Sequence, residues 1–162
     1  MQENRWTAVG KALMPLIMQT LKQVELFQGL TSQQLERLSA LCQTHIWSRG
    51  DIIFKQGDPA NTLYVIASGQ VEIAVHNAQG DLTPEIYLGS GQIIGEMGLV
   101  DAGTRSASAI AAEDNTHIYS ILADNLNRLC EDDTALGYRL MRHIAQDLSF
   151  KLRHHDTTIA EQ

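Results

Sequence analysis

The feature that most constrains the fold of this chain is a central stretch, about residues 46–122, in which glycines separate short apolar runs. The runs rich in β-forming residues are 51–54, 63–66, 70–75, 85–88, 106–111 and 116–121. The glycines of the stretch are Gly50, Gly57, Gly69, Gly80, Gly89, Gly91, Gly95, Gly98 and Gly103. Many short strands joined by glycine-containing turns are typical of a β-sandwich or a jelly roll, so the sequence predicts a mainly β domain here.

Two of these runs support finer expectations. In 70–75 the apolar residues Val71, Ile73 and Val75 alternate with Glu72 and Ala74, which is the pattern of a strand with one buried face. The next residues, 77–81, are Asn-Ala-Gln-Gly-Asp and predict a hairpin turn after that strand.

The segment before the β stretch has helical spacing. Apolar residues recur every three or four positions at Trp6, Val9, Leu13, Leu16, Ile17 and Leu21. Pro15 lies inside that pattern and predicts a kink or a split, because proline lacks a backbone N–H and clashes with the preceding turn. Thr31 and Gln34 then have the spacing of a capping box, which predicts a second helix. Its apolar stripe is Leu35, Leu38 and Leu41.

The segment after the β stretch, about 123–155, is helical again. Its apolar residues step by four positions at Leu136, Leu140, Ile144, Leu148 and Leu152. This stripe predicts one long amphipathic helix. The helix can pack against the β domain or form the seam of a dimer, and we expect it to do both in a homodimer. The polar end, 156–162, predicts a flexible tail.

The composition argues against several classes of function. Acidic residues outnumber basic ones by 19 to 12, which gives a net charge of −7 and predicts no nucleic-acid partner. The sequence has neither an apolar run of membrane-spanning length nor a signal-peptide pattern. The two cysteines, Cys42 and Cys130, predict no disulfide framework and fit a reducing cytoplasm. The six histidines have no metal-ligand spacing, so we expect no metal site.

The residues best suited to bind a ligand are concentrated in 91–107, which reads GQIIGEMGLVDAGTRSA. A buried cyclic phosphate needs a planar, bidentate cation, and arginine supplies one. It also needs backbone N–H groups at a helix N-terminus, and glycines let such a backbone approach closely. A sugar hydroxyl needs an acceptor such as a carboxylate. The residues that supply this set are Gly95, Glu96, Gly98, Arg105 and Ser106.

This stretch resembles the phosphate-binding cassette of cyclic-nucleotide-binding domains. Such domains occur in bacterial catabolite activator proteins, in regulatory subunits of cAMP-dependent kinase and in gated ion channels. The matching residues are 95–99 and 105–107, and the upstream match includes 26–31, Gly50, Ile53, Gly57, 64–66 and Gly69. The resemblance covers about 25–150. It implies an α+β, mainly β fold, namely an eight-stranded jelly-roll barrel flanked by N-terminal helices and a long C-terminal helix.

The resemblance also implies a role for each cassette residue. Glu96 would accept the ribose 2′-OH, Arg105 would pair with the cyclic phosphate, and Ser106 would donate its hydroxyl to that phosphate. The remaining residues expected to line the ligand are Gly95, Met97, Gly98, Leu99 and Ala107. The alternative for Glu96 and Arg105 is a structural ion pair between two barrel loops.

The base of the nucleotide is the part that the sequence matches least well. Catabolite activators place hydroxyl residues of the long helix against adenine, whereas this chain has Lys151 and Leu152 at those positions. We expect base contacts from Phe150, Lys151 and Leu152, with cAMP as the ligand and cGMP as the other candidate. Catabolite activators also continue into a helix-turn-helix domain. This sequence ends at Gln162 without such a segment, which adds to the expectation that the chain does not bind DNA.

These features predict three parts: an N-terminal helical extension (1–25), a cyclic-nucleotide-binding domain (26–155) and the tail (156–162). The predicted function is a stand-alone cytoplasmic sensor that relays ligand binding to an effector protein or a dimer mate through its terminal helices. The alternative is a ligand-free interaction or dimerisation module with the same fold. An enzyme is not expected, because no nucleophile stands beside a base. A four-iron cluster is not expected either, because two cysteines cannot ligate one.

Overall fold

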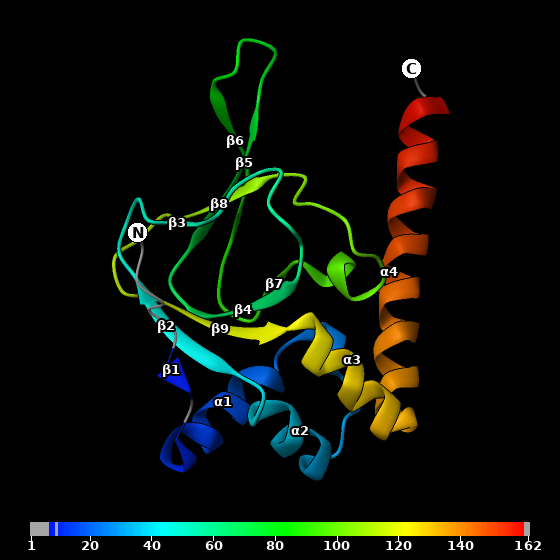
Figure 1. Ribbon diagram of the computed structural model, residues 1–162. Helices are drawn as coiled ribbons and strands as arrows, with labels where there is room; N and C mark the ends of the chain where they lie inside the picture. The colour runs from blue at the N-terminus through cyan, green and yellow to red at the C-terminus, as the bar shows by residue number, and fades with distance from the viewer. Residues whose placement is uncertain (1–6, 9, 161–162) are drawn as a thin grey trace.

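The strands form two antiparallel sheets in the computed structural model, which describes residues 7–8 and 10–160 (Figure 1). The five-stranded sheet has the order β1 (Thr7–Ala8), β2 (Gln43–Trp47), β9 (Thr116–Leu122), β4 (Thr62–Ser68) and β7 (Ile93–Ile94). The four-stranded sheet has the order β3 (Ile52–Phe54), β8 (Ser108–Ala111), β5 (Val71–His76) and β6 (Leu82–Leu88). Strands β2 to β9 are the eight strands of the expected jelly roll, which is confirmed, although the sheets do not join into a closed barrel.

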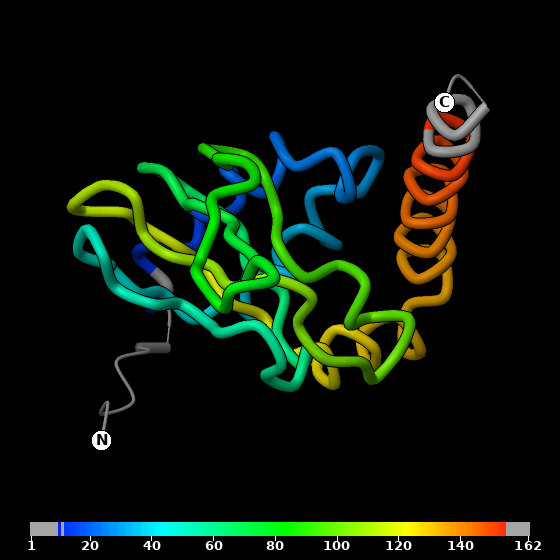
Figure 2. The backbone as a smooth tube through the Cα atoms, turned by 90° about the horizontal axis from the view of Figure 1, so that it is seen from above, coloured from blue at the N-terminus to red at the C-terminus, as the bar shows by residue number. Residues whose placement is uncertain are grey.

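The helices lie outside these sheets. Their bounds are η1 (Lys11–Leu13), α1 (Met14–Leu21), η2 (Glu25–Phe27), α2 (Ser32–Ser39), η3 (Glu96–Leu99), α3 (Ala123–Asp132) and α4 (Thr134–Ala160). In Figure 1, α1 and α2 lie beneath β2 and β9, and α4 stands beside the sheets as a rod. Figure 2, turned by 90°, shows α4 at one side of the molecule again. Among the described residues, no helix is long and apolar enough to cross a membrane, and no cluster of metal-ligating side chains occurs.

Strand β4 separates two hydrophobic cores. Leu63 and Val65 face the core formed with the helices, whereas Tyr64 and Ile66 face the core between the two sheets. Successive side chains of a strand point to opposite faces, so a strand covered on both sides must be apolar at consecutive positions. This arrangement explains why 63–66 is an unbroken apolar run.

The N-terminal segment differs from the expected kinked helix. Helix α1 begins at Met14, so Pro15 lies in its first turn, where the missing N–H leaves no helical hydrogen bond unmade. Ile17 and Leu21 are buried as expected, but Leu13 and Leu16 are exposed. The expected stripe therefore covers only part of the helix face. Trp6 and Val9 lie outside the described residues.

Two details of the strands also differ from expectation. Strand β2 occupies 43–47, where the sequence pattern indicated helix up to about residue 45. In β5 the register against β6 shifts between Ile73 and Ala74. The extra residue lies in β6, where Ile86 and Pro84 stand opposite the consecutive Ile73 and Ala74. Ala74 is buried and Val75 is only half-buried, so the expected alternation ends at Ile73. The expected turn after β5 is confirmed, with the N–H of Asn77 donating to the carbonyl of Asp81 over 2.8 Å.

The capping box expected at Thr31 is confirmed. The N–H of Gln34 donates to the Thr31 hydroxyl over 3.1 Å, and the N–H of Thr31 donates to the Gln34 side-chain oxygen over 2.9 Å. The Gln34 amide also donates to Asp133, at the junction of α3 and α4, over 3.2 Å. This contact connects the start of α2 to the start of α4.

Thr31→Ala is expected to lower the free energy of unfolding by about 1 kcal/mol, because the first turn of α2 loses its side-chain acceptor. Urea denaturation measures this change. Gln33→Ala, at an exposed position of the same turn, is the control and should change stability by less than about 0.5 kcal/mol. Equal stability of Thr31→Ala and the parent would contradict the proposed contribution of the box.

Helix α4 confirms the long C-terminal helix but buries only part of its stripe. Leu136, Leu140 and Ile144 belong to the core beneath the sheets. Leu148 is only partly buried against that core, and Leu152 is 62% exposed. The helix continues to Ala160 and so includes 156–160, which the sequence assigned to a tail.

Candidate ligand-binding site

The cassette begins with a tight turn that only glycine accommodates easily. Gly95 has a φ of 92°, and the N–H of Gly98 donates to its carbonyl over 3.1 Å to form the short helix η3. A Cβ on Gly98 would collide with the backbone carbonyl of Ala60. A Cβ on Gly95 would meet the guanidinium of Arg105 and stand 2.9 Å from the carbonyl of Thr62. The two glycines therefore allow η3 to lie directly against the chain around β4.

Arg105 is held in place by its backbone. Its N–H donates to the carbonyl of Asp58 over 2.7 Å, and its own carbonyl accepts from the N–H of Gly57 over 2.8 Å. Only 6% of the residue is exposed, so the guanidinium projects from this fixed backbone into the interior. Its position is thus set by the loop before β4 rather than by η3.

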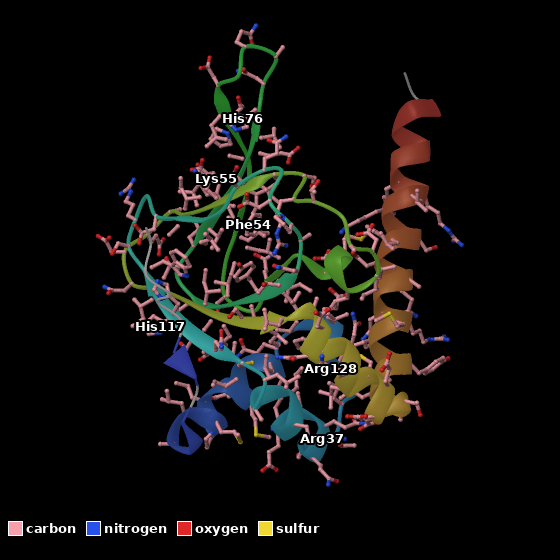
Figure 3. All side chains as sticks on the ribbon, viewed as in Figure 1. Arg37, Phe54, Lys55, His76, His117 and Arg128 are labelled. Atoms are coloured by element: carbon pink, nitrogen blue, oxygen red, sulfur yellow. The ribbon has the colours of Figure 1, made fainter. Side chains whose placement is uncertain are left out.

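The Arg105 guanidinium has an unusual environment for a buried charge. One nitrogen, Nη2, donates to the carbonyl of Thr62 over 2.7 Å, and the group lies 4.2 Å from the ring centre of Phe54 and 5.5 Å from that of Tyr64. Figure 3 shows Phe54 between the two sheets. Among the described residues, the Nε of Arg105 has no hydrogen-bond partner, and no carboxylate forms an ion pair with the guanidinium.

Burial therefore has an electrostatic consequence here. It lowers the pKa of Arg105, while Tyr64 and Asp58 act in the opposite direction. An arginine keeps its proton even so, because its ordinary pKa lies far above neutral pH. A permanent positive charge with a free donor and no described carboxylate partner favours binding of an anion.

Glu96 faces the other side of the cassette. Its side chain is 21% exposed, and Oε1 lies 3.6 Å from the ammonium of Lys151 on α4. Lys151 in turn lies 2.8 Å from the carboxylate of Asp147, one helical turn earlier. The structural ion pair between Glu96 and Arg105 does not form, because each side chain has a different partner.

A groove of about 710 Å³ separates α4 from η2 and the edge of the sheets. Of the expected site residues, Glu96, Phe150 and Lys151 line it. Arg105, Ser106 and Leu152 do not. Phe150 is exposed and its ring centre lies 3.8 Å from that of His154. The structure thus brings the sugar-binding candidate and two of the three expected base contacts to one groove.

The remaining cassette residues have varied surroundings. Leu99 is buried in the core beneath the sheets, and Ala107 packs against the core between them. Met97 and Ser106 are exposed, while Gly98 is half-buried. Leu99 therefore anchors η3 by packing, and the Ser106 hydroxyl is accessible to a ligand.

Sequence reasoning missed the groups that surround Arg105. Thr62, Phe54 and Tyr64 come from two strands of different sheets, and only the folded arrangement brings them to one guanidinium. It also missed that Lys151 contacts Glu96. A weak signal existed in the aromatic residues of two predicted strands, but nothing in the sequence indicated which way they face.

Comparison with known proteins adds independent evidence. Residues 44–133 match the family model of the cyclic nucleotide-binding domain. The Cyclic AMP receptor protein of Thermus thermophilus is 31% identical to this chain, in a match that covers 81% of this chain and 76% of the relative. The crystal structure of the Thermus thermophilus catabolite activator protein superposes with a TM-score of 0.73 at 31% identity, covering 84% of this chain and 62% of that chain.

Other relatives share less sequence or are much longer. A cyclic nucleotide-binding domain from Methylobacillus flagellatus superposes with a TM-score of 0.77 at 23% identity, covering 97% of this chain and 88% of that chain. Glutaminase 1 of Bradyrhizobium diazoefficiens is 34% identical over 127 residues, which are 78% of this chain but only 20% of that protein. Because its cassette, jelly roll and matched residues agree, the chain belongs to the cyclic nucleotide-binding domain family.

Proposed function

We propose that this chain binds a cyclic nucleoside monophosphate, cAMP in the first place, and acts as a stand-alone regulatory sensor rather than an enzyme. The observation that supports this most strongly is Arg105, a buried guanidinium with a free Nε and no described carboxylate partner. A cyclic phosphate supplies the missing negative charge. Glu96 would accept from the ribose 2′-OH, and the choice of cAMP rests on the Thermus thermophilus relative, which is named for it.

The proposed output runs through α4 and the N-terminal helices. Helix α4 contributes to the groove at Phe150 and Lys151 and also contacts the N-terminal part, where His143 Nδ1 lies 2.8 Å from the carbonyl of Leu26. A ligand that favours one position of α4 would therefore also change the contact between α4 and η2. The receiver is an effector protein or a second copy bound along α4, where Tyr138 and Leu152 are exposed apolar residues. A cytoplasmic setting remains part of this proposal.

One observation favours the alternative, a ligand-free interaction or dimerisation module. Arg105 already donates to Thr62, and Glu96 already contacts Lys151, so both groups have a partner within the chain. A module that never binds nucleotide would retain these contacts permanently. In the sensor, by contrast, ligand must add to them or replace them.

Thermal unfolding with and without nucleotide separates the two functions. A ligand that binds only the folded state adds about 2.7 kcal/mol at a concentration of 100 times its Kd, which raises Tm by roughly 5–10 °C for a chain of this size. We expect that rise with cAMP and a smaller one with cGMP at equal concentration. Adenosine 5′-monophosphate, which lacks the cyclic phosphate, is the control. Unchanged Tm with both cyclic nucleotides would favour the ligand-free module.

A further inference from the structure

Lys151 of α4 contacts one carboxylate of the cassette and one of its own helix. Its ammonium lies 2.8 Å from Asp147 Oδ2 and 3.6 Å from Glu96 Oε1. Asp147 and Lys151 are four residues apart on α4, a spacing at which an acidic and a basic side chain meet on one helix face. All three side chains line the same groove.

The carboxylate of Glu96 has few other constraints. Among the described residues, Lys151 is the one charged group in ion-pair contact with it. Glu96 is the first residue of a helix only four residues long, so its backbone leaves the long side chain free to choose among rotamers. Fixing such a side chain when the ligand binds costs conformational entropy. A contact that already holds the side chain before binding makes this cost smaller.

We propose that Lys151 is a positioning residue: it holds the carboxylate of Glu96 ready for the sugar 2′-OH and thereby joins α4 to the ligand site. The inference rests on the proposed function. A carboxylate has two oxygens and about four acceptor sites, so contact of Oε1 with Lys151 leaves Oε2 for the ribose. Ammonium has three donors, and Asp147 uses one of them to direct Lys151 toward the cassette.

The electrostatics agree with this geometry. The hydrogen bond to Asp147 is the largest cause that raises the pKa of Lys151, and Glu96 raises it as well. Lys151 therefore remains a cation throughout the neutral range. The lysine side chain is 58% exposed, so its ion pairs add little to folding stability. The role should consequently appear in ligand selection rather than in Tm.

The test compares cAMP with 2′-deoxy-cAMP by calorimetric titration. The parent chain should prefer cAMP by about tenfold or more, because a hydrogen bond to a charged acceptor is among the stronger ones. In Lys151→Met, which keeps most of the aliphatic stem, the preference should fall below about threefold. Lys151→Arg should restore most of it, because the guanidinium retains the charge and can reach both carboxylates.

Arg142→Met is the matched control. It removes one positive charge from the same helix at an exposed residue that donates to Tyr138 and does not line the groove. It should keep the parental preference, and Tm of all variants should stay within about 2 °C of the parent.

The outcomes distinguish the inference from the proposed function. If the parent chain binds neither nucleotide, both the proposed function and the role of Lys151 are overturned. Parent chain that binds cAMP and its 2′-deoxy analogue equally well overturns only the role of Lys151, because Glu96 then makes no use of the 2′-OH. The role of Lys151 is also overturned if Lys151→Met keeps the full preference for cAMP over 2′-deoxy-cAMP. The same holds if Lys151→Arg does not restore that preference, or if Arg142→Met loses as much of it as Lys151→Met does.

Discussion

Arg105→Ala should weaken cyclic-nucleotide binding by about 2–5 kcal/mol, which is roughly thirtyfold to several thousandfold in Kd. The reason is the environment of the guanidinium. It is buried against Phe54, and among the described residues it has no carboxylate partner, so the phosphate would be its first strong counter-charge. Without Arg105 the phosphate would enter a largely dry site unpaired. Isothermal titration calorimetry with cAMP measures the change.

Two further variants sharpen this result. Arg105→Lys should restore only part of the affinity, because an ammonium lacks the planar fork that can donate to Thr62 and a phosphate at once. Arg128→Ala removes the same charge from the exposed face of α3 and should leave affinity unchanged (Figure 3). A circular dichroism melt checks that each variant is folded. Affinity of Arg105→Ala equal to that of the parent would disprove the assignment of the phosphate site.

Leu140→Ala is expected to lower the free energy of unfolding by about 2–5 kcal/mol. Leu140 lies in the core beneath the sheets and is fully buried, so truncation removes apolar contacts and leaves a cavity. It also holds α4 against the rest of the domain, together with Leu136 and Ile144. Urea denaturation followed by circular dichroism measures the loss.

Leu152→Ala is the matched control for this prediction. The two leucines belong to the same apolar stripe, whose residues are four positions apart, but Leu152 is 62% exposed. Its truncation should therefore change stability by no more than about 0.5 kcal/mol. Similar losses for both variants would mean that α4 packs along its whole stripe, contrary to the structure.

Local signals in the sequence were enough to predict much of the fold. The capping box at Thr31 involves only residues three apart, so neighbouring groups determine it. The same holds for the turn after β5, where Asn77 and Gly80 occupy positions that favour it. The cassette is also local, and its glycines have the close backbone approaches that their spacing suggested.

The features that escaped prediction depend on distant partners. Strand β2 follows α2 almost directly, and its own residues do not distinguish a strand from a continued helix. Its pairing with β9, which is distant in the sequence, defines it as a strand. The register shift at Ile73 arises from the partner strand β6. The contact between Lys151 and Glu96 depends on the direction in which α4 leaves the domain. No spacing within the sequence encodes that direction.

The pairing of β2 with β9 also governs how the chain can fold. Gln43 stands opposite Ser120, so the five-stranded sheet joins residues from both ends of the β region. Proteins dominated by such non-local pairs fold in milliseconds to seconds, because a long loop must close before any contact rewards it. During synthesis, the edge of β2 that pairs with β9 has no partner strand until β9 follows, whereas β1 on its other edge has already emerged. Tyr119 and Ile121 of β9 belong to the core that the helices share, so the helices at both ends can complete their burial only after β9 is in place.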